Sequence, residues 1–274
     1  MVHTLELLAV LLPLLYALLT AAYAIVFFRD EPGVARLLTP SLSVVLILHL
    51  LYVALRTALY EHIPLANVFE TLTVMGFALT FVYWITERFV KTSNTGMFVL
   101  GVVFLFQTIS SAFIGHEVEV NPVLRSPLFG AHTTTAVLGY TGFALSAVYG
   151  VLYLMLYHEL KVNRFGIIYG RLPSLGTLGV MHERAAFVGL VAMTAAITIG
   201  MAWLPKTEFG WALTDPKVAM TLLIWVLYVF VLLGYRFSWA SRVRLIYVSI
   251  IGFLLLVFST IAVNLWLQSF HAFI

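Results

Sequence analysis

The chain has 274 residues, of which 62% are hydrophobic and only 10% are charged, with a formal net charge of +3 at pH 7. Soluble domains carry about 25% charged residues, so this composition excludes a soluble globular protein. The chain has no cysteine, which excludes disulfides, Cys-ligated zinc and iron–sulfur clusters. The basic residues form no continuous stripe, which argues against a nucleic-acid partner.

Eight apolar stretches follow one another along the chain, and a membrane-spanning helix needs roughly 20 such residues. Hydropathy places the helices at residues 5–28, 39–59, 67–87, 96–114, 130–157, 182–204, 217–235 and 243–267. The connections between them are short, and the longest on the basic side, 158–182, is interpreted as a connector. The sequence therefore predicts an all-α, polytopic membrane protein of about eight transmembrane helices, forming a single transmembrane domain over residues 1–274.

The basic residues predict the orientation of these helices. Eleven of the fifteen lie in the connections after helices one, three, five and seven: Arg29, Arg36, Arg88, Lys91, Lys161, Arg164, Arg171, Arg184, Arg236, Arg242 and Arg244. The other four, Arg56, Arg125, Lys206 and Lys217, flank the opposite side. By the positive-inside rule, we expect a multi-pass protein of the cell (inner) membrane with both termini on the outer, periplasmic side.

His49 lies near the middle of the second predicted helix, where an ionisable side chain is costly unless it is hydrogen-bonded or binds a ligand. It could ligate a cofactor within the membrane, or it could be a neutral imidazole hydrogen-bonded inside the bundle, near Ser41 and Ser43.

Glu70, at the start of the third predicted helix, also has two interpretations. It could cap that helix, or it could form an ion pair with Arg56.

The fifth predicted helix contains a stripe of small residues, because Gly142, Ser146 and Gly150 follow one another at four-residue spacing. Such a stripe lets another helix approach closely in a membrane. The simplest interpretation of the stripe is therefore helix packing.

Two histidines, His132 and His271, stand at the outer ends of long apolar helices, the fifth and the eighth. Imidazoles at matching depth on different helices could ligate one haem iron from opposite faces, because haem commonly takes His as an axial ligand. Two unrelated interfacial histidines would occupy the same positions, so their spacing alone leaves both interpretations open.

The outer connection before the seventh helix ends in Asp215-Pro216-Lys217, which is a helix-start signal because Asp caps free N–H groups and Pro is tolerated in the first turn. In the same connection, Trp211 and Phe209 could form an aromatic platform for a flat macrocycle. Lys217, or Lys206 upstream, would then be available to its propionates. Tryptophan is also common at membrane interfaces, so composition alone does not settle the role of Trp211.

Several segments, taken in chain order, carry a resemblance to a known family. They are Pro64–Leu72 (PLANVFETL), Gly130–His132 with Leu138–Tyr140, Arg171–Leu175 with Arg184, Asp215–Lys217 with Trp225 and Tyr228, and Asn264–His271. Together they resemble the CcsA/HemX-like branch of the cytochrome c assembly family, which handles haem with a Trp-rich outer "WWD" segment flanked by two outward histidines. Of that segment the chain keeps Trp211 and Asp215–Lys217, and Leu232 or Leu233 stands where fuller members carry a further His.

The resemblance implies a haem-handling protein of cytochrome c maturation. It implies that His132 and His271 hold haem b axially at the outer face, beside Trp211 and Asp215, for delivery to apocytochrome c. His49 is a further candidate for cofactor binding because of its depth in the membrane. The resemblance also implies an assembly factor rather than a catalyst by itself, acting with a second membrane subunit that has a large outer domain. The reduced Trp-rich segment favours, as an alternative, a HemX-like accessory or regulatory protein of haem biosynthesis. A secondary transporter is the third alternative, although the sequence contains no paired inverted repeat.

Overall fold

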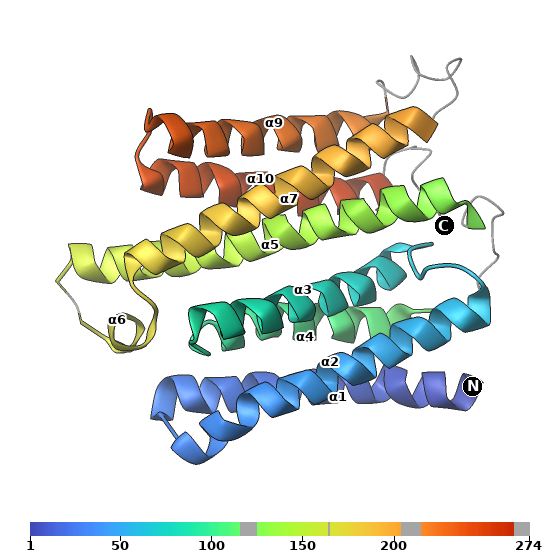
Figure 1. Ribbon diagram of the computed structural model, residues 1–274, viewed down its shortest axis with the longest axis horizontal. Coiled ribbons are helices and arrows are strands. Elements are labelled where there is room, and N and C mark those ends of the chain that lie inside the picture. The colour runs from blue at the N-terminus through green and yellow to red at the C-terminus, as the bar shows by residue number, and fades with distance from the viewer. Residues whose placement is uncertain (116–124, 164, 204–214, 266–274) are drawn as a thin grey trace. The chain divides into compact units, whose positions relative to one another are not determined.

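The computed structural model describes residues 1–115, 125–163, 165–203 and 215–265, and the regular elements among them are helices (Figure 1). They are α1 (Val2–Arg29), α2 (Pro32–Tyr60), α3 (Val68–Val90), α4 (Gly96–Phe113), α5 (Pro127–Lys161), α6 (Ile167–Arg171), α7 (Leu175–Trp203), α9 (Pro216–Phe237) and α10 (Arg242–Leu265). In this described part of the chain, 8 helices, all except the short α6, are long and apolar enough to cross a membrane. The predicted all-α, multi-pass membrane fold is confirmed.

Two helices begin well before the positions that hydropathy predicted. Helix α2 begins at Pro32 instead of residue 39, with the proline in its first turn, where a missing N–H costs nothing. Helix α7 begins at Leu175 instead of residue 182, after Ser174, whose hydroxyl accepts a hydrogen bond from the backbone N–H of Thr177 at 3.2 Å. The first turn of each helix contains glycine or polar residues, so its average hydropathy is too low to predict a membrane helix. Each helix nevertheless begins at a helix-start signal.

The chain divides into two compact units, which are described separately. Unit 1 contains residues Met1–Arg125 and Val162–Pro173, and therefore α1 to α4 and α6. Unit 2 contains residues Ser126–Lys161 and Ser174–Ile274, and therefore α5, α7, α9 and α10. The single transmembrane domain over residues 1–274 stays a prediction.

Helix α6, within the predicted connector 158–182, closes one end of unit 1. The guanidinium of Arg171 lies 2.8 Å from the carboxylate of Asp30, which follows α1. The side-chain amide of Asn94, in the turn between α3 and α4, donates a hydrogen bond to the carbonyl oxygen of Arg171. These contacts attach α6 to the end of α1 and to the turn between α3 and α4.

Unit 2 is built on a close crossing of α5 and α7. A Cβ atom placed on Gly142 of α5 would lie 2.5 Å from the Cα atom of Gly189 on α7, so the two backbones touch there. One turn further along α5, the hydroxyl of Ser146 lies 3.0 Å from Nδ1 of His182 on α7. The packing role predicted for the small-residue stripe is confirmed at these positions.

The Gly142 crossing predicts a steric cost for even one methyl group. Gly142→Ala should lower the free energy of unfolding by about 1–3 kcal/mol, because the new methyl group forces α5 and α7 apart. Gly33→Ala is the matched control, since a Cβ at Gly33 meets no atom within 4 Å. Helical circular dichroism recorded during heating in detergent measures both variants. Equal midpoints for the two variants would contradict the close crossing.

Candidate functional site

The imidazole of His132 lies in the second turn of α5 and packs against α7 in unit 2. Its Nδ1 atom lies 2.8 Å from the carbonyl oxygen of Ala196. Because a carbonyl oxygen only accepts, Nδ1 donates the proton, and the neutral ring has its lone pair on Nε2. Metal-binding histidines are commonly oriented in this way, with the second ring N–H donated to a backbone carbonyl. The tautomer that this hydrogen bond implies therefore fits a ligand role for Nε2.

Gly200 of α7 makes the space that the His132 ring occupies. A Cβ atom at Gly200 would lie 2.8 Å from Cε1 and 2.9 Å from Nδ1 of His132, so a larger residue would displace the ring. Neither of these two contacts of the His132 ring, with Ala196 and with Gly200, was predicted from the sequence. Ala196 contributes a backbone carbonyl, which no pattern of side chains reveals. The one signal in the sequence is the small residue Gly200, one turn further along α7.

Asp215 starts helix α9, as the sequence predicted. Its Oδ1 atom accepts hydrogen bonds from the backbone N–H groups of Lys217 at 2.9 Å and Val218 at 3.2 Å, and the side chain is buried. Pro216 occupies the first helical position, where it is tolerated. The cap thus fixes the position from which Lys217 leaves the first turn of α9.

Two of the predicted site residues lie outside the described residues. These are Trp211, in the connection before α9, and His271, after α10. The structure therefore describes one of the two predicted axial ligands, His132, together with Asp215. In the described part of the chain, no group of three or more His, Asp or Glu side chains could hold a metal ion.

His49 lies in a hydrogen-bonded network at the centre of unit 1. The hydroxyl of Thr73 donates its proton to Oε1 of Gln107 at 2.8 Å, so it accepts from Nε2 of His49, 3.0 Å away. Nδ1 of His49 lies 2.8 Å from the hydroxyl of Tyr16, which also lies 2.9 Å from Oγ1 of Thr80. The ring is fully buried and both its nitrogens are used, so iron ligation would require this network to open. The cofactor role of His49 stays a prediction, and the geometry supports its structural alternative.

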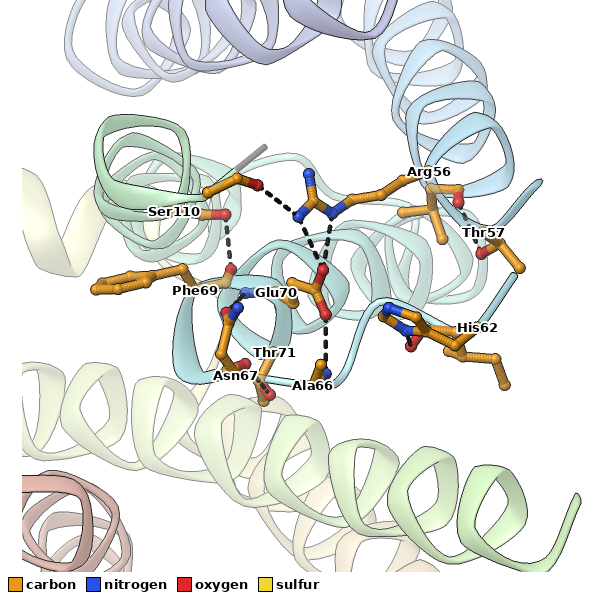
Figure 2. A network of polar contacts seen from close by, with 12 residues as sticks. Arg56, Thr57, His62, Ala66, Asn67, Phe69, Glu70, Thr71 and Ser110 are labelled. Carbon is orange, nitrogen blue, oxygen red and sulfur yellow. Dashed lines mark hydrogen bonds and ion pairs between the residues drawn. The ribbon is translucent and has the colours of Figure 1, made fainter. Parts of the chain in front are cut away.

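Figure 2 shows how the segment before α3 joins this helix to α2 in unit 1. Glu70 accepts from Nε of Arg56 at 2.9 Å and from the backbone N–H of Ala66 at 2.8 Å, and both charged side chains are fully buried. Asn67 caps the helix, since its side-chain oxygen accepts from the backbone N–H of Glu70 at 2.9 Å. The predicted Glu70–Arg56 pair is confirmed, and the cap is provided by the neighbouring asparagine.

The chain is similar to proteins that assemble cytochrome c. The family model described as "Cytochrome C assembly protein" matches residues 65–271. The chain is 23% identical over 239 residues to the cytochrome c biogenesis protein CcsA of Mesostigma viride, which covers 78% of each chain. It is 28% identical over 216 residues to the protein HemX of Brevibacillus brevis, covering 78% of this chain and 79% of that one. It is 26% identical over 223 residues to HemX of Bacillus subtilis (strain 168), covering 78% of each.

Proposed function

Because the chain belongs to the cytochrome c assembly protein family, we propose that it holds haem b at the outer membrane face and delivers it to apocytochrome c during cytochrome c maturation. The single observation that carries this proposal is the orientation of His132, whose Nδ1–H is donated to Ala196 so that Nε2 has the lone pair. Bound haem would supply the iron that this nitrogen ligates.

Each site residue has a distinct role in the proposal. His132 and His271 would ligate the haem iron from separate parts of the chain, and Trp211 would cover the face of the macrocycle. Asp215 acts indirectly, because its cap fixes the first turn of α9 beside the site. Gly200 keeps the space in which the His132 ring lies.

The proposal also defines what other molecules must supply. The chain has no cysteine, so the thiols that form thioether bonds with haem come from apocytochrome c, and their reduction comes from elsewhere. We propose a second membrane subunit with a large outer domain as the partner that presents the apocytochrome. The chain would act in the inner membrane as one functional domain with both termini outside, and as an assembly factor rather than a catalyst by itself.

The proposal is tested by the absorption spectrum of the protein purified in detergent. The wild type should show a Soret band, and the double variant His132→Ala/His271→Ala should lose it, because both axial nitrogens are removed. His3→Ala is the matched control, since the side chain of His3 is fully exposed. A wild type without a Soret band after haem addition, or a double variant with an unchanged spectrum, would reject the ligand assignment.

The second candidate function is a HemX-like accessory role in haem biosynthesis. It is favoured by the two HemX relatives, at 28% and 26% identity, and by the single tryptophan kept in the Trp-rich segment. Deleting the gene separates the two functions. Loss of c-type cytochromes supports the first function, whereas a change confined to tetrapyrrole enzyme levels supports the second.

A further inference from the structure

The connection between α5 and α7 exposes large apolar side chains in and beside α6. No residue of α6 itself is buried, and Phe165, Ile167 and Tyr169 are between 46% and 63% exposed. The rings of Phe165 and Tyr169 contact each other, with their centroids 4.8 Å apart. Exposed apolar patches of this kind often mark a surface that another molecule or a membrane covers. We call residues Phe165–Arg171 the α6 segment.

The contacts of the α6 segment place it at the basic end of unit 1. Arg171 pairs with Asp30, directly after α1, and its carbonyl accepts from Asn94 in the α3–α4 turn, beside which α6 lies in Figure 1. The end of α1 and this turn also carry Arg29 and Lys91, which are exposed. In the described part of the chain, neither of these two cations forms an ion pair. The α6 segment therefore borders two positive charges.

The same end of unit 1 has the pattern of a membrane–water interface. Phe28 and Phe89 are exposed there, and each is next to an arginine in the sequence. The guanidinium of Arg88 lies over the ring of Trp84, 4.0 Å from its centroid. Aromatic and basic residues gather in this way at the headgroup level of membrane proteins. The α6 segment lies beside the ends of α1 and α3, so it continues this level.

The connection is longer than its linking role requires. It contains residues 162–174, whereas helices that pack side by side, as α5 and α7 do at Gly142 and Gly189, can be joined by about 2–5 residues. The additional length contains the exposed apolar side chains, which are costly in water. Insertion at the boundary between headgroups and acyl chains removes such side chains from water. The α6 segment therefore has the properties of an interfacial anchor.

We propose that the α6 segment is a docking surface for anionic phospholipid in the leaflet at the basic end of unit 1. Its apolar side chains, Phe165 and Ile167 among them, insert at the headgroup boundary, and the acyl chains cover them. The neighbouring cations Arg29 and Lys91 attract the negative charge of the phosphate esters. The inference is independent of haem binding and adds a lipid partner to the protein.

The chain has no cysteine, so one introduced thiol is a unique labelling site. A bimane label on Ile167→Cys, in the full chain in nanodiscs of phosphatidylcholine and phosphatidylglycerol, reports what surrounds the α6 segment. Its quenchers are iodide in the water and the 5-doxyl derivative of either lipid in the leaflet. Glu31→Cys, exposed in the turn between α1 and α2, is the water reference. Ile47→Cys, exposed near the middle of α2, is the lipid reference, and Phe165→Cys provides a second label in the segment.

We expect iodide to quench the label at Ile167 at least about threefold less than the label at Glu31, because insertion shields it from water. At equal mole fraction, doxyl phosphatidylglycerol should quench it at least about twofold more than doxyl phosphatidylcholine, because each nearby cation attracts anionic lipid. The label at Ile47 should show no difference between the two lipids. Arg29→Gln/Lys91→Gln should remove the difference at Ile167. The matched control Arg29→Lys/Lys91→Arg keeps both charges and should retain it.

Three results would overturn the proposal. If iodide quenches the labels at Ile167 and Glu31 equally, the segment faces water. If neither iodide nor the doxyl lipids quench the label at Ile167, protein covers the segment, either a second copy of this chain or another protein. If the two doxyl lipids quench it equally, or if the preference for phosphatidylglycerol survives in Arg29→Gln/Lys91→Gln, these charges select no anionic lipid. Helical circular dichroism checks that each labelled variant is folded.

Discussion

Replacing Glu70 by glutamine should lower the free energy of unfolding by about 3–5 kcal/mol, which is the cost of breaking a buried ion pair from one side. The pair with Arg56 is fully buried, and the Nη2 atom of Arg56 lies 2.8 Å from Glu70 Oε1. Nη1 of Arg56 already has no hydrogen-bond partner among the described residues. Removing the carboxylate charge would therefore leave a guanidinium without compensation in the interior of unit 1.

The chain provides a matched control for this variant. Glu61 and Arg125 form a pair at the same distance, 2.8 Å, but their side chains are 70% and 56% exposed. An exposed pair contributes about 0–1 kcal/mol, so Glu61→Gln should change stability little. Unfolding of both variants in mixed detergent micelles, followed by helical circular dichroism, gives the comparison. Similar losses for the buried and exposed pairs would contradict the role assigned to burial.

A double variant shows whether the uncompensated charge is the cause. Arg56→Met/Glu70→Met removes both charges and keeps the apolar volume, so it should be less destabilised than Glu70→Gln alone. If the double variant is worse than the single one, the ion pair itself and its contact with Ala66 carry the stability of this segment.

Replacing His49 by leucine should cost about 2–4 kcal/mol of stability and leave haem binding intact. The loss arises because the hydroxyls of Tyr16 and Thr73 each lose a hydrogen-bond partner inside unit 1. The haem content per folded molecule should equal that of the wild type, because both His49 nitrogens are used within the network. Thermal unfolding and the Soret absorbance, measured on the same sample, separate the two effects.

The network supplies its own control through coupling. In the His49→Leu background, Tyr16→Phe should cost less than it does in the wild type, because one of the two partners of the Tyr16 hydroxyl, His49 and Thr80, is already gone. Additive losses would mean that Tyr16 and His49 act independently. A His49→Leu variant that stays stable and loses its Soret band would establish His49 as a ligand.

The sequence predicted those features that depend on local pattern. Apolar length identified the membrane helices, Asp215 before Pro216 identified the start of α9, and the spacing of small residues identified the face of α5 on which another helix packs. A local sequence pattern does not show which group of another helix will form a hydrogen bond with a buried polar side chain. His49 and His132 both stood out in the sequence as candidate ligands, yet one uses both nitrogens in its own unit, and the other has its tautomer set by the carbonyl of Ala196.

Helix α6 has a consequence for the order in which the protein is made. Its contacts with Asp30 and Asn94 belong to unit 1, but the ribosome synthesises α6 only after α5, which belongs to unit 2. Folding during synthesis usually completes one unit before the next emerges. In this chain, unit 1 is completed by α6 only after α5 of unit 2 has been synthesised. A chain truncated after residue 125 would therefore lack α6 and its contacts with unit 1.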